Sequence, residues 1–101
     1  MNWQGLMPAI TTQIAADGQI DHDFVARHVT WLIDHGCDGI VPCGSLGEGA
    51  TLDFDEKVEL MSTCVDALGG RAPVVPGIAA TRTRTAVRLC QRAKSVGSRG
   101  L

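Results

Sequence analysis

The feature that most constrains the fold is a regular alternation of short apolar runs with amphipathic segments. The apolar runs lie at residues 6–11, 39–43 and 73–78, and each is followed by a segment whose apolar residues recur at helical spacing. The runs are apolar along their whole length, which is typical of strands buried on both faces. Such strands belong to a parallel sheet covered by helices, so we predict a β-α-β-α-β-α order.

The helix boundaries are predicted from capping residues at about 22–35, 54–68 and 83–96. Asp21 and Asp53 are suited to N-cap positions, and Glu56 follows Asp53 at the spacing of a capping box. Gly36 and Gly97 stand where a helix ends in a left-handed residue. The expected buried faces are Val25, Val29, Leu32 and Ile33 in the first helix, Val58, Met61, Val65 and Leu68 in the second, and Ala86, Cys90 and Ala93 in the third.

Two architectures fit this order, an open doubly wound sheet and a (β/α)8 barrel. The final segment 96–101 repeats the form of segment 35–40: a helix end, a glycine, two residues, a second glycine and an aliphatic residue. We therefore expect the chain to stop at the opening of a fourth strand, and residues 1–101 to form one incomplete α/β domain. Ile10, Val41 and Val75 are expected on the inner side of the sheet, where an unclosed barrel would leave them without an opposing layer.

Composition excludes several classes of function. The net charge of −2 is spread over interspersed charges, so no nucleic-acid partner is expected. The apolar runs are far shorter than the ~20 residues of a membrane span, and the N-terminus carries no signal-peptide pattern. We expect a cytoplasmic protein with reduced thiols, no metal and no cofactor, because neither the histidines nor the cysteines have metal-site or redox spacing; the latter are Cys37, Cys43, Cys64 and Cys90.

The stretch GSLGEGATL, residues 44–52, is the candidate binding loop. It follows the second apolar run and precedes a helix, and this edge of a parallel sheet is where ligands bind in both architectures. Glycines allow backbone N–H groups to approach an anion closely. The spacing fits neither the G-x-G-x-x-G fingerprint nor a P-loop, so a small carboxylate is favoured over a nucleotide. A tight turn that binds nothing is the alternative.

The segment Gly44–Glu48, followed by Thr51 and Leu52, resembles the G-[ST]-x-G-E motif of the dihydrodipicolinate synthase / N-acetylneuraminate lyase family. Five other parts of the chain resemble that family in order. They are Pro8–Thr12; Asp17, Gly18, Ile20 and Asp21; Leu32, Ile33, Gly36, Gly39 and Ile40; Pro73–Gly77; and Ala93, Gly97 and Gly100, which resemble the approach to strand four. Members are (β/α)8 barrels that act on pyruvate and other 2-keto acids as class I, Schiff-base-forming aldolases and lyases. The resemblance implies the N-terminal β-α-β-α-β-α portion of such a barrel.

The resemblance also implies roles for the loop. Its backbone amides at Ser45 and Leu46 would hold the carboxylate of the keto acid, and the Ser45 hydroxyl would take part in a proton relay with tyrosines. Gly44, Gly47 and Glu48 would support the loop, Glu48 by accepting loop N–H bonds.

Three positions depart from the family pattern. Leu46 stands where many members have a second hydroxyl, Gln13 replaces a proline, and Gly49 replaces a serine or asparagine. A sugar-acid aldolase, a dehydratase or a related lyase is therefore implied as readily as dihydrodipicolinate synthase itself.

The family's Schiff-base lysine and relay tyrosines lie on later strands, and this chain has no tyrosine. Lys57 and Lys94 are expected on solvated helix faces. The 101-residue chain is thus expected to be inactive alone. The resemblance implies that its full-length parent is a carbon–carbon or carbon–oxygen lyase and a homo-oligomer, commonly a tetramer. Two alternatives remain: a complete small phosphate- or nucleotide-binding module, and a non-enzymatic relic of a barrel that pairs through its open sheet edge.

Overall fold

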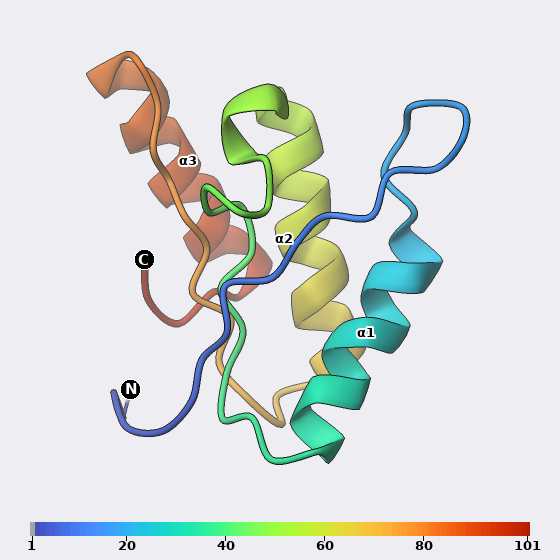
Figure 1. Cartoon of the computed structure of the whole chain (residues 1–101). Coiled ribbons are helices and arrows are strands. Elements are labelled where there is room, and N and C mark those ends of the chain that lie inside the picture. Colours follow the sequence, from blue (N-terminus) through green and yellow to red (C-terminus); the bar gives the residue numbers. More distant parts are fainter. Residues whose placement is uncertain (1) are drawn as a thin grey trace.

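The computed structural model describes residues 2–101 and contains three helices connected by extended segments (Figure 1). In chain order they are α1 (His22–Asp34), α2 (Phe54–Leu68) and α3 (Thr83–Val96), with a short 3-10 turn η1 (Gly49–Thr51) before α2. The predicted helices are confirmed, and the largest difference is one residue at the end of α1. The helices lie side by side, because α2 packs against both α1 and α3.

The helix ends form as the capping residues predict. The Asp21 carboxylate accepts a hydrogen bond from the N–H of Phe24 (3.0 Å). At the start of α2, Asp53 accepts from the N–H of Glu56 (2.8 Å), and Glu56 accepts from the N–H of Asp53 (3.0 Å), which completes the capping box. Gly36 and Gly97 follow their helices at φ +100° and +104°, which strains residues with a side chain.

The extended segments pair in parallel, as predicted, but only at single points. Ala9 is bridged to Val41, and Ile40 to Val74, so the middle segment lies between the other two. Among residues 2–101, no extended run is regular enough to form a continuous strand, and the predicted strand lengths are therefore not confirmed. Prolines contribute to this irregularity, because they donate no ladder hydrogen bond; they lie at residues 8, 42, 73 and 76.

The chain after α3 returns to the same layer. The N–H of Arg99 donates to the carbonyl oxygen of Val74 (3.2 Å), so this part of the chain lies beside the third extended segment. The turn before α1 is closed differently, by an antiparallel bridge between Ile14 and Ile20.

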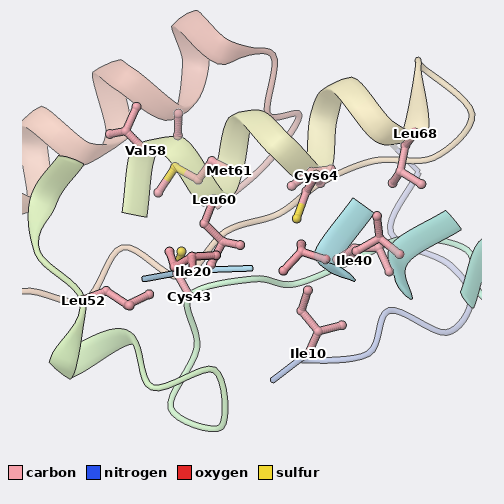
Figure 2. Packing of buried hydrophobic residues seen from close by; sticks show 14 of the residues in the cluster. Ile10, Ile20, Ile40, Cys43, Leu52, Val58, Leu60, Met61, Cys64 and Leu68 are labelled. Carbon is pink, nitrogen blue, oxygen red and sulfur yellow. The ribbon is translucent and has the colours of Figure 1, made fainter. Parts of the chain in front are cut away.

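The hydrophobic core lies between the extended segments and the helices (Figure 2). Its fully buried residues include Ile40, Val29 in α1, Leu60, Met61, Cys64 and Leu68 in α2, and Leu89 and Ala93 in α3. Leu89 was not predicted on the inner face of α3, whereas Ala86 and Cys90 are only half-buried. Val65 is also half-buried and packs at the margin of the core.

The expectation that Ile10 points away from the helices is wrong. Ile10 is 4% exposed and packs in the core beside Ile40. Because successive side chains of an extended segment point to opposite faces, Ala9 and Val41 then lie on the uncovered face. Val75 is buried as well, so of the three residues expected to lack an opposing layer only Val41 remains half-exposed.

None of the helices in residues 2–101 is long and apolar enough to span a membrane.

Candidate functional site

The glycine-rich loop joins the second extended segment to α2 and is held by its own backbone. The N–H groups of Gly47 and Gly49 both donate to the carbonyl oxygen of Gly44 (3.1 Å each), and the N–H of Glu48 donates to that of Ser45 (3.1 Å). The N–H groups of Ser45 and Leu46 lie outside this set of bonds, and both residues are exposed. The loop therefore forms a compact turn with Ser45 and Leu46 at its tip.

Two of the three loop glycines are required by close approach of backbone. A Cβ atom at Gly49 would lie 2.3 Å from the carbonyl oxygen of Cys43, and one at Gly47 would lie 2.8 Å from that of Ile10. Gly44 has open space where its side chain would be. The room left by Gly47 and Gly49 is thus filled by neighbouring backbone, and only Gly44 leaves space free.

Glu48 adopts a left-handed backbone conformation (φ +58°) and precedes η1. Its carbonyl oxygen accepts hydrogen bonds from the N–H (2.9 Å) and the hydroxyl (2.8 Å) of Thr51. Its side chain makes no capping hydrogen bond. The contribution of Glu48 to the loop in this structure therefore comes from its backbone.

Thr12 contacts the loop from the first extended segment. Its side chain is 7% exposed, and its hydroxyl donates to the carbonyl oxygen of Gly47 at 2.6 Å. No role for Thr12 is predicted from the sequence. A hydroxyl residue at the end of the first apolar run was the available signal, but its partner lies 35 residues away, and only the tertiary structure shows the pairing.

A cavity of about 860 Å³ opens beside the loop, between α2, α3 and segment 77–81. Its lining includes Ser45, Glu48, Lys57, Thr81 and Thr85. Ser45 is thus brought close to the start of α2 and to the segment that precedes α3.

The expectation of a solvated Lys57 is wrong. Lys57 is 9% exposed, and its Nζ donates to the carbonyl oxygen of Ala79 (3.3 Å). The capping box positions Lys57 one turn into α2, on the side that faces segment 77–81, where its long aliphatic part is covered. Lys94 is exposed, as expected.

The buried cysteines beside the loop are poor nucleophiles. Burial raises the pKa of Cys43 to about 11, against a smaller lowering by the charge of Lys57. Burial, and to a lesser degree the neighbouring Cys43, raises the pKa of Cys64 to about 12. Both groups are thiols at neutral pH, and the thiolate is the reactive form. Within residues 2–101, no cluster of three or more His, Cys, Asp or Glu side chains could hold a metal ion.

The chain matches the model of the dihydrodipicolinate synthetase family over residues 2–101. It is 44% identical to the 4-hydroxy-tetrahydrodipicolinate synthase of Acidothermus cellulolyticus over 95% of this chain and 31% of that protein. It is 40% identical to the synthase of the same name from Maridesulfovibrio salexigens, over 97% of this chain and 33% of that protein.

Solved structures give the same result. Dihydrodipicolinate synthase from Aquifex aeolicus superimposes with a TM-score of 0.92 at 33% identity, over 97% of this chain and 33% of that one. YagE of E. coli K12, solved in complex with pyruvate, gives 0.91 at 32% identity, over 95% and 32%. N-acetylneuraminate lyase from Mycoplasma synoviae gives 0.88 at 30% identity, over 95% and 33%.

In each case the chain spans about a third of the length of the protein that it matches. The match extends over almost all of this chain, including the loop and all three helices. The chain therefore belongs to the dihydrodipicolinate synthetase family.

Proposed function

We propose that this chain is the carboxylate-binding part of a Schiff-base-forming aldolase or lyase that acts on a pyruvate-type 2-keto acid. In the full-length protein, residues 1–101 would supply strands one to three and the start of strand four of a (β/α)8 barrel. Family membership supports this proposal, as does the relative solved in complex with pyruvate. The whole enzyme would be a carbon–carbon or carbon–oxygen lyase.

One observation carries the proposal: the N–H groups of Ser45 and Leu46 are not used in the bonding that closes the loop. They lie at an exposed tip beyond the end of a parallel-paired segment, the edge at which barrel enzymes bind substrates. Two adjacent N–H groups can hold both oxygens of a carboxylate. A carboxylate held there fixes the neighbouring keto group for attack by an amine.

Ser45 and Leu46 have different parts in this proposal. The Ser45 hydroxyl lies beside the proposed carboxylate position and can move a proton to or from the reacting keto acid. Leu46 contributes its N–H alone, since its side chain is apolar and 71% exposed. Gly44, Gly47 and Glu48 support the turn.

The amine is proposed to come from another part of the full-length protein. Lys57 is held by the carbonyl oxygen of Ala79 at the wall between α2 and segment 77–81, and Lys94 lies on the exposed side of α3.

We further propose that the full-length protein is a cytoplasmic homo-oligomer, commonly a tetramer. It would need no metal or cofactor and would have neither nucleic acid nor membrane as a partner.

Reductive trapping tests the proposal. The full-length protein and the 101-residue chain are each incubated with pyruvate and borohydride, and their intact masses are measured. We expect one adduct per full-length chain and none on residues 1–101. Lys57→Met in both proteins is the control for adventitious reaction at the cavity wall. A full-length protein without an adduct would overturn the proposal, as would a stoichiometric adduct on the 101-residue chain.

Ser45→Ala in the full-length protein tests the proton transfer. Turnover is expected to fall by about 10²-fold or more, because a positioned proton donor or acceptor contributes about that much. Thr81→Val, which removes a hydroxyl from the other side of the same cavity, is the matched control and should retain turnover. Equal turnover in Ser45→Ala and the unmodified protein would show that the hydroxyl has no part in the reaction.

A further inference from the structure

We propose that Thr12 is a positioning residue, which fixes the orientation of the Gly47–Glu48 peptide and through it the tip of the carboxylate-binding loop. The consequence for keto-acid binding rests on the proposed function above; the effect on the loop itself does not. Thr12 would not touch the substrate. It would act through the backbone that presents the N–H groups of Ser45 and Leu46.

The contact is short and buried. The Thr12 hydroxyl donates to the carbonyl oxygen of Gly47 at 2.6 Å, and the side chain is 7% exposed. Little water can reach this carbonyl to replace a lost hydroxyl, so removal of the hydroxyl would leave the buried oxygen without its donor. We therefore expect the loop to change conformation so that this oxygen regains a donor.

The same peptide unit continues the connection to the tip. The carbonyl of Gly47 and the N–H of Glu48 belong to one planar peptide, so the orientation of one fixes the other. That N–H donates to the carbonyl oxygen of Ser45 (3.1 Å). The hydroxyl of Thr12 is therefore connected to Ser45 by two consecutive hydrogen bonds, which polarise each other favourably.

A second observation shows that the segment containing Thr12 packs closely against this peptide. A Cβ atom at Gly47 would lie 2.8 Å from the carbonyl oxygen of Ile10 and 3.4 Å from the Thr12 hydroxyl oxygen. Gly47 thus packs directly on segment 10–12, with no room for a side chain between them.

The experiment compares Thr12→Val, nearly isosteric but without the hydroxyl, with Thr12→Ser, which keeps it, in the full-length protein. Hydrogen exchange of segment 44–49 and the pyruvate concentration for half-maximal trapping are measured. We expect Thr12→Val to increase both by about two- to tenfold, the range for one lost hydrogen bond, with the trapping rate at saturating pyruvate little changed. In Thr12→Ser, both the exchange rate and this pyruvate concentration should equal those of the unmodified protein.

Thr30→Val is the matched control, because it also removes a hydroxyl that bonds to a backbone carbonyl, that of Ala26 (2.8 Å), but on α1. It should leave both measurements unchanged. Faster exchange throughout α1–α3 in Thr12→Val would overturn the proposal, since the effect would then be general destabilisation; unchanged exchange at 44–49 would overturn it too.

If the unmodified protein traps no pyruvate, the proposed function fails, and exchange at 44–49 still decides the role of Thr12 in the loop. If Thr12→Val does not fold, Thr12→Cys replaces it, because a thiol is similar in size and only a weak donor. Hydrogen exchange at 44–49 is then expected to be faster in Thr12→Cys than in Thr12→Ser. Equal exchange in these two variants overturns the proposal.

Discussion

At the scale of single residues, the loop packs against the carbonyl group of Cys43. Cys43 has a left-handed backbone (φ +63°), uncommon for a residue with a side chain. Its carbonyl oxygen lies where Cβ atoms at Gly49 and at Gly77 would be only 2.3 Å and 2.7 Å away. Two segments from different parts of the chain therefore approach one backbone group, and each needs glycine there.

Gly49→Ala tests this packing. The added methyl group would overlap the Cys43 carbonyl, and backbone cannot move aside as a flexible side chain can, so we expect a loss of about 1–3 kcal/mol in the free energy of unfolding. Gly44→Ala is the matched control in the same loop, with nothing within 4 Å and an expected change within about 0.5 kcal/mol. Urea unfolding of the full-length protein measures both. Equal stabilities of the two variants would contradict the packing explanation.

Because two thiols are buried, we expect the free energy of unfolding to decrease in alkaline solution. The pKa values of Cys43 and Cys64 are raised to about 11 and about 12 from an ordinary 9.0, so above pH 9 the thiols ionise in the unfolded chain first. Unfolding then releases protons, and the free energy of unfolding falls as the pH rises from 9 towards 12. Below pH 9 the two thiols are protonated in both states and add no pH dependence to the stability. Urea unfolding at pH 8, 9.5 and 10.5 measures this. Cys43→Ala/Cys64→Ala should show a smaller decrease over the same interval, and an identical decrease would exclude the thiols as its cause.

At the scale of elements, α2 is the helix that positions the site. Its capping box fixes where the helix begins, and that start determines where Lys57 lies against segment 77–81. Its other face supplies the centre of the core, and it packs against both α1 and α3. α3 differs, because its N-cap Arg82 makes no side-chain capping bond.

Asp53→Ala tests the cap of α2. We expect it to lower the free energy of unfolding by about 0.5–2 kcal/mol, because the N–H of Glu56 loses its acceptor. Asp55→Ala is the control, since it removes an equal charge from the same first turn without removing a capping bond; about 0.3–1 kcal/mol is expected from the helix dipole alone. Thermal unfolding of both variants gives the comparison. A larger loss in Asp55→Ala would show that charge, and not the cap, stabilises the start of α2.

At the scale of the whole molecule, the helices cover one face of the extended layer and leave the other open along the first two extended segments, whereas Val75 in the third segment is buried. Ala9 and Thr11 are exposed, and Val41 is only half-buried. The molecule is accordingly thin in one direction, with extents of 35 × 34 × 21 Å. Large apolar side chains are exposed as well, among them Trp3 (64%) and Leu6 (61%). In the proposed full-length barrel, the remaining strands would pack against this open face.

We therefore expect residues 1–101 alone to self-associate or to lack cooperative packing. An extended layer with open edges and one uncovered face favours pairing with other chains. Light scattering after size exclusion, together with a thermal melt and dye binding, measures this. The full-length protein under the same conditions is the control and should melt cooperatively. A monodisperse 101-residue monomer with a sharp melt would contradict the expectation.

The sequence alone determined the elements whose causes are local. The starts of α1 and α2 follow from Asp21, Asp53 and Glu56, whose bonds reach three residues along the chain, and helix ends follow from glycines that accept a left-handed backbone. The parallel order follows from the alternation of apolar runs and helices, and the motif at 44–48 indicated the family to which the chain belongs.

Only the tertiary structure decided which residues meet across the chain. The bond from Thr12 to Gly47 spans 35 residues, that from Lys57 to Ala79 spans 22, and the burial of Ile10 depends on which face of its segment the helices cover. Local patterns do not contain these contacts, because periodicity predicts that a residue lies on one face or the other but not which face the rest of the chain covers. For the same reason, the purpose of Gly47 and Gly49, to admit the backbone of Ile10 and Cys43, became visible only in the fold.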